Sequence, residues 1–162
     1  MPIFKAVSLK LLKPFLYTLF LCLPVTTFAA EDPIVSTSVS GNYHDVANSI
    51  RAAILGKGIH IAHELSASDM LNRTGSAYGY NNNTYTDARI FEFCSASISQ
   101  KLARQNPDNI VLCPFIISVY TLVDEPDSVH ITYKKPVGRA GSEEIVKEVI
   151  ELISSIIEDA SW

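Results

Sequence analysis

The chain of 162 residues lacks the short motifs that identify most catalytic, nucleotide-binding and metal-binding sites. It has no glycine-rich phosphate loop, no Gly-x-Ser-x-Gly elbow, no His-Glu-x-x-His pair and no calcium-binding loop. Cysteine is scarce, and none of the three residues has the Cys-x-x-Cys spacing of a thioredoxin-like redox site. We therefore predict no catalytic residue and no metal ligand, favour a binding protein over an enzyme, and identify no cofactor.

Basic residues are also few. The chain has 13 Lys and Arg against 17 Asp and Glu, which gives a net charge of −4. An acidic surface repels phosphate groups, so the charge argues against nucleic acid and anionic membrane as partners.

The first 29 residues have the pattern of a signal peptide. Three lysines precede an apolar run over residues 14–28, and Thr27-Phe28-Ala29 fits a cleavage signal. An uncleaved anchor is the alternative, but the run is shorter than the ~20 apolar residues of a spanning helix. We predict cleavage after Ala29 and a periplasmic or secreted protein with no stable membrane insertion. Loss of the three lysines would change the net charge from −4 to −7.

Cleavage would leave two cysteines, Cys94 and Cys113. Three interpretations remain open: a structural disulfide, two buried thiols, or a reactive pair that switches redox state or holds a metal, haem or sulfur species. Cys94 precedes a predicted helix that begins at Ser95, and a helix N-terminus stabilises a thiolate or a small anion. Cys94, Ser95 and Cys113 are therefore candidate ligand-binding residues, and the two cysteines are a candidate disulfide.

The segment over residues 66–87 is rich in loop-forming residues and contains Tyr78, Tyr80 and Tyr85. Tyrosines on a loop are suited to lining a ligand or partner surface, so Tyr78 and Tyr80 are candidate ligand-binding residues. The alternative is a flap that packs over its own sheet edge. A cavity beneath this loop would favour ligand binding.

His63 is the last candidate ligand-binding residue. In a predicted strand it shares a face with Ile59 and Ile61, where a histidine is typically a hydrogen-bonded core residue. A site with Cys94 or Cys113 is the alternative.

The pattern of apolar residues predicts a two-layer α+β domain over residues 30–141, with one twisted, mainly antiparallel sheet backed by helices. A C-terminal amphipathic helix over residues 142–162, capped by Ser142, would pack on this domain or form a homodimer seam. The predicted strands cover 34–40, 59–65, 88–94, 110–123 and 129–133, and the other predicted helices cover 43–55 and 95–105.

Four segments in this order resemble the family called domain of unknown function 302. They are Ala52-Ala53-Ile54-Leu55-Gly56-Lys57-Gly58, Ile90 to Ser95, Leu112-Cys113-Pro114-Phe115 to Tyr120, and Val129 to Pro136. Together they cover about Val39 to Pro136. The resemblance implies a TATA-binding-protein-like α+β fold, an ability to dimerise and no agreed catalytic activity. Family members often place the second cysteine after the proline, whereas Cys113 precedes Pro114 here.

These observations predict an exported domain that binds an unknown small molecule or periplasmic protein. A thiol-based protein that uses Cys94 and Cys113 is the alternative, and a structural interaction module is a third possibility.

Overall fold

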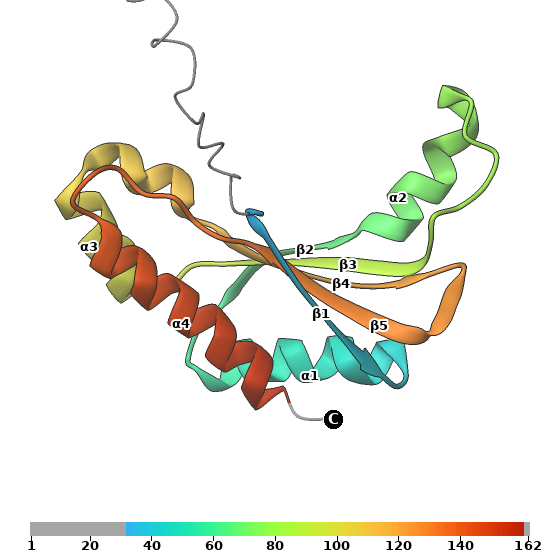
Figure 1. Cartoon of the computed structure of the whole chain (residues 1–162), viewed down its shortest axis with the longest axis horizontal. Helices are drawn as coiled ribbons and strands as arrows, with labels where there is room; N and C mark the ends of the chain where they lie inside the picture. The colour runs from blue at the N-terminus through green and yellow to red at the C-terminus, as the bar shows by residue number, and fades with distance from the viewer. Residues whose placement is uncertain (1–31, 161–162) are drawn as a thin grey trace, which may run out of the picture. The chain divides into compact units, whose positions relative to one another are not determined.

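In the computed structural model, which describes residues 32–160, one five-stranded antiparallel sheet has helices packed on one face (Figure 1). The strand order β1-β5-β4-β3-β2 confirms the predicted α+β class. The predicted signal peptide lies outside the described residues. The strands are β1 (Ile34–Ser40), β2 (Ile61–Ser66), β3 (Tyr85–Phe93), β4 (Phe115–Leu122) and β5 (Glu125–Lys134). The helices are α1 (Tyr43–Gly56), α2 (Ala67–Thr74), α3 (Ala96–Gln105) and α4 (Glu143–Asp159), with 3₁₀ helices η2 (Gly75–Tyr78) and η3 (Pro107–Leu112).

One face of the sheet is buried and the other is open. Along β4, the buried residues Phe115, Ile117 and Val119 alternate with more exposed ones, because successive side chains of a strand point to opposite faces. Helices α1 and α4 lie beneath the buried face (Figure 1). The largest fully buried side chains of this core are Phe91, Phe93, Ile50, Ile54, Leu102, Ile117, Ile131, Ile153 and Ile156.

Helix α1 begins where the sequence predicts it, because Asn42 caps it. The Asn42 side-chain oxygen accepts hydrogen bonds from the backbone N–H groups of His44 (2.8 Å) and Asp45 (3.3 Å). These bonds satisfy two of the free donors of the first turn, and the Asp45 carboxylate lies at the positive end of the helix.

The predicted strand over residues 110–123 is wrong at its N-terminal end. Residues 107–112 form η3, and β4 begins only at Phe115. Pro107 occupies the first turn of η3, and the Asn106 side chain caps it by accepting from the Asp108 N–H at 2.9 Å. An apolar sequence fits either structure, and the cap and proline favour the helical turn here.

The buried amide of Asn109 joins three segments. Its Nδ2 donates to the Leu102 carbonyl (3.1 Å) and to the Ser142 hydroxyl (2.8 Å), and its Oδ1 accepts from the Arg139 N–H (2.9 Å). Ser142 therefore does not cap α4 through its side chain, contrary to the sequence prediction. The fully buried Ser142 hydroxyl accepts the hydrogen bond from the Asn109 amide instead.

Helix α4 contributes to the core of its own domain. Val149, Ile153 and Ile156 are each at most 1% exposed, and the helix packs against α1 and α3. Two roles were predicted for this amphipathic helix, and its apolar face packs in the core of the domain. Dimerisation stays a prediction.

Candidate functional site

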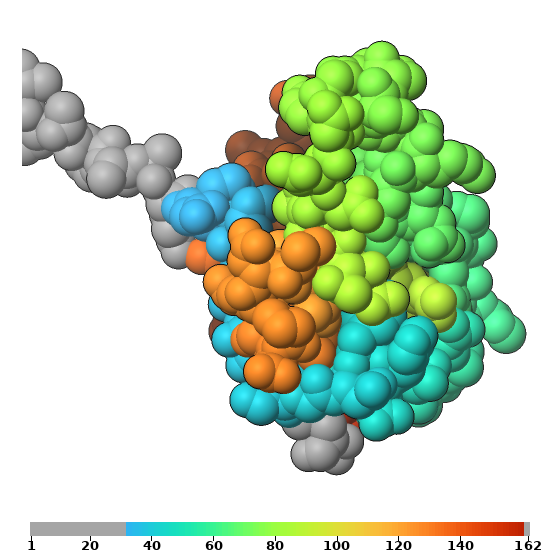
Figure 2. Space-filling model, turned by 90° about the vertical axis from the view of Figure 1, so that its right-hand side faces the viewer, coloured from blue at the N-terminus to red at the C-terminus, as the bar shows by residue number. Residues whose placement is uncertain are grey.

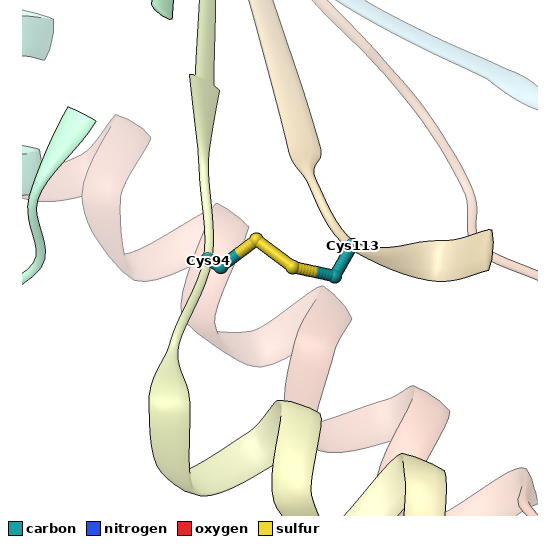
Figure 3. Close-up of a disulfide and its surroundings, with 2 residues drawn as sticks. All are labelled: Cys94 and Cys113. Carbon is teal, nitrogen blue, oxygen red and sulfur yellow. A yellow bond between two sulfur atoms is a disulfide. The ribbon is translucent and has the colours of Figure 1, made fainter. Parts of the chain in front are cut away.

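A disulfide joins Cys94, directly after β3, to Cys113, which directly follows η3 and lies two residues before the start of β4 (Figure 3). Their Cα atoms are 5.7 Å apart, and the bond spans 19 residues of sequence. Of the three interpretations left open by the sequence, this structure contains the disulfide. In this state neither sulfur is a thiolate nucleophile or a free ligand.

Ser95 directly precedes α3, and its role in binding an anion stays a prediction. Its side chain is 8% exposed, and its hydroxyl lies 3.2 Å from the Ser97 hydroxyl rather than capping α3. Either hydroxyl can donate the hydrogen bond between them.

The predicted placement of His63 is wrong. A β-bulge shifts the register of β2, so that Ile61 lies opposite Phe93 while His63 lies opposite Glu92. An extra residue in one strand reverses the faces beyond it, which puts His63 on the open face, exposed to solvent. Within the described part of the chain, the His63 imidazole has no hydrogen-bond or ion-pair partner.

The tyrosine segment borders an open cavity of about 380 Å³. Helix α2, η2 and the following loop extend past the end of the sheet (Figure 1), and they form the green and yellow-green top of the molecule in Figure 2. The cavity is lined by three tyrosines, two apolar side chains, five uncharged polar side chains and one glycine. These residues are Tyr78, Tyr80, Tyr85, Met70, Leu71, Asn72, Asn82, Asn83, Thr74, Thr84 and Gly75.

A tight reversal of the chain brings these side chains together. The Tyr80 N–H donates to the Gly75 carbonyl at 3.0 Å, and Gly79 between them has a φ of +82° that favours glycine. Asn72 Nδ2 reaches back to the Tyr85 carbonyl at 3.4 Å. Tyr78 and Tyr80 remain 76% and 73% exposed, so their rings are available to a ligand.

A row of rings connects this cavity to the open face of the sheet. Tyr85 packs edge-on against Tyr120, with ring centroids 5.3 Å apart, and Tyr120 stacks on His130 at 4.9 Å. His130 Nε2 lies 3.0 Å from a carboxylate oxygen of Glu125, which fixes the imidazole at the far end of the row.

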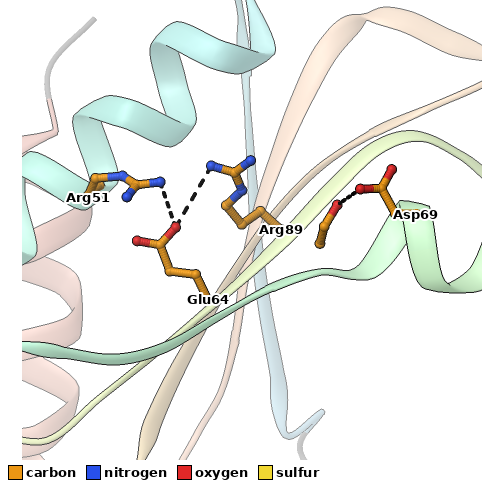
Figure 4. A network of polar contacts seen from close by, with 5 residues as sticks. Arg51, Glu64, Asp69 and Arg89 are labelled. Carbon is orange, nitrogen blue, oxygen red and sulfur yellow. Dashed lines mark hydrogen bonds and ion pairs between the residues drawn. The ribbon is translucent and has the colours of Figure 1, made fainter.

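Charged residues gather elsewhere, between α1 and strands β2 and β3 (Figure 4). Arg51 and Arg89 both point toward Glu64, with N–O distances of 2.6 Å and 3.8 Å to the same carboxylate oxygen. Burial raises the pKa of the neighbouring Tyr43 phenol, and the Arg89 charge opposes that effect. The Arg51–Glu64 ion pair joins α1 to β2, so it helps to hold α1 against the sheet.

A family model described as a domain of unknown function, DUF302, matches residues 35–160. The chain belongs to the DUF302 family. The match extends past the segment Val39 to Pro136 that carries the sequence resemblance, and it includes both the tyrosine segment and α4.

A crystal structure of an uncharacterized conserved DUF302 protein from Bacillus stearothermophilus has the same fold. The TM-score is 0.64 at 16% sequence identity, over 80% of this chain and 98% of that chain. Among curated proteins, none matches the chain. The comparisons establish family and fold, so the function has to be argued from the residues.

In this DUF302 protein, the predicted ligand-binding residues fall into three places. Cys94, Ser95 and Cys113 lie around the disulfide, His63 lies on the open face, and Tyr78 and Tyr80 line the cavity. Met70 and Leu71 were missed, because the sequence signal for α2 was weak. Residues 32–160 contain no group of three or more His, Cys, Asp or Glu side chains suited to a metal ion. None of the helices in that range is long and apolar enough to cross a membrane.

Proposed function

We propose that this DUF302 protein is an exported binding protein for a small, uncharged molecule, held in the tyrosine cavity. The cavity beneath the loop of Tyr78 to Tyr85 carries this proposal, because a loop that only covers its own sheet edge would leave no such space. Its volume of about 380 Å³ falls within the range of small-molecule sites.

The lining indicates an uncharged ligand that bears hydroxyl groups, such as a short carbohydrate. None of the eleven described residues that line it is charged, so an ionic ligand would lose its hydration without gaining an opposite charge. Tyrosine rings supply flat apolar faces, and each asparagine amide both donates and accepts hydrogen bonds. Sugars present that combination of apolar faces and hydroxyl groups.

Export is supported by the N-terminal pattern and by the disulfide, because disulfides persist chiefly in oxidising compartments. A thiol-based function is not proposed, because both cysteines of the described chain are bonded to one another.

Titration calorimetry with cellobiose and N,N′-diacetylchitobiose tests the proposal. We expect Tyr80→Ala to weaken binding at least about fivefold, since truncating a central tyrosine costs more than about 1 kcal/mol. Tyr80→Phe keeps the ring and should retain most of the affinity. Both substitutions should leave the melting temperature nearly unchanged, because Tyr80 is 73% exposed.

Leu55→Ala is a matched control, because Leu55 is also exposed but lies on α1, outside the cavity. Equal affinities for Tyr80→Ala and Leu55→Ala would contradict the assignment of the site. Absence of binding by either sugar, with tight binding of charged analogues, would contradict the ligand class.

A further inference from the structure

Strands β4 and β5 separate at one end of the sheet. Their pairing stops at Ser118 and Thr132, although β4 begins at Phe115 and β5 continues to Lys134. Each strand stays paired on its other side, β4 with β3 as far as Phe115 and β5 with β1 as far as Lys134. Backbone groups along the inner sides of these two ends therefore lack the partners that a continuous ladder would supply.

A second cavity, of about 370 Å³, lies at this separation. Its floor belongs to the domain core, because Phe115, Val149 and Ile153 line it and are at most 4% exposed. Its rim carries Val111 and Val137, whose side chains are 80% and 78% exposed. Apolar surface thus continues from the solvent to the core, which suits an aliphatic chain.

Among the described residues that line this cavity, the charged ones are two lysines, Lys134 and Lys135. Lys134 belongs to a chain with a net charge of −4, so its positive charge stands out against its surroundings. The Lys134 ammonium forms no ion pair with any other residue of the range 32–160. Charge complementarity therefore favours an anion at this end of the cavity.

The disulfide fixes one wall. Leu112 and Pro114, which flank Cys113, both line the cavity, and the bond to Cys94 holds this wall against the end of β3. A wall fixed in this way loses little freedom when a ligand binds, and such preorganisation increases affinity.

We propose that this cavity binds an amphipathic carboxylate, an aliphatic chain that ends in a single carboxylate group. The chain lies over Phe115, Val149 and Ile153, and the carboxylate pairs with Lys134. This site is separate from the tyrosine cavity and shares no lining residue with it.

Decanoate is the probe, and calorimetry together with backbone amide chemical shifts of the purified protein is the measurement. We expect the shifts to change at residues 111–116 and 134–137. Lys134→Met should weaken decanoate binding about tenfold, since a charge-assisted pair is lost, and decan-1-ol should bind the unaltered protein about tenfold more weakly than decanoate. Lys147→Met is the matched control on exposed α4 surface and should bind like the unaltered protein.

A second pair of variants tests the apolar rim. Val137→Asp places a negative charge at the mouth and should weaken decanoate binding. Val123→Asp, at an exposed valine in the β4–β5 turn, should not. Equal binding by Lys134→Met and Lys147→Met, equal binding of acid and alcohol, or shifts confined to residues 70–85 would each overturn the proposal. Saturable decanoate binding with unchanged sugar binding would support this site independently of the tyrosine cavity.

Discussion

The Asn109 amide donates a 2.8 Å hydrogen bond to the Ser142 hydroxyl, across 33 residues of sequence. Both residues are almost fully buried, and the same amide also bonds Leu102 and Arg139. One side chain thus joins α3, the turn η3 and the segment that precedes α4.

Asn109→Ala should therefore destabilise the protein. The substitution leaves buried polar groups without partners, and each such group costs about 1–3 kcal/mol. We expect the free energy of unfolding, measured with urea, to fall by about 2–4 kcal/mol. Asn81→Ala, in an exposed loop, is the matched control and should change it by less than about 0.5 kcal/mol. Equal effects of the two substitutions would show that the Asn109 bonds add no net stability.

The disulfide couples the effects of substitutions at Cys94 and Cys113. Cys94→Ser and Cys113→Ser should each lower the free energy of unfolding by a similar amount, about 3 kcal/mol for a loop of this length. The double variant should be no less stable than either single one, because either substitution already removes the bond. Thermal unfolding of the three variants measures this, and clearly additive losses would show that the sulfurs contribute separately.

The Glu143 carboxylate makes the stability of the fold depend on pH. Hydrogen bonds from the backbone N–H groups of Glu143 and Gly141 hold the pKa of its carboxyl below the usual value. A lowered pKa in the folded state means that the ionised form stabilises the fold above the unfolded pKa. This contribution is lost as the pH falls through the folded pKa.

Glu143→Gln should consequently reduce stability at neutral pH and have a smaller effect in acid. Glu144→Gln, on the adjacent exposed residue, is the control with no such bond to Gly141. Urea unfolding between neutral and acidic pH measures the difference between them. A loss of stability by Glu143→Gln that is the same at every pH would argue against the carboxylate bond as its cause.

Much of the fold follows from local signals in the sequence. Strand β1 and helix α1 lie where alternation and the Asn42 cap predict them. The start of β4 was misplaced, because Ile110 and Val111 are apolar yet 63% and 80% exposed. Burial distinguishes a strand from a turn at such positions, and burial depends on the tertiary fold.

The sites were predictable only in part. Tyr78 and Tyr80 stand out in the sequence because they occur in a loop, and both line a cavity. The bulge that turns His63 to the open face has no counterpart in the residue pattern, since it depends on pairing with β3. The cavity beside Lys134 depends on where two strands separate, which no local pattern specifies.

The bulge in β2 also makes the two edge strands of the sheet, β1 and β2, unequal in regularity. Strand β1 pairs with β5 through seven successive residues without interruption, whereas the β2 register is broken between Ile61 and His63. An irregular edge strand is a poor template for an incoming strand, whereas a regular edge strand is a good template. Self-association through backbone pairing, including aggregation of partly unfolded chains, would therefore start at β1.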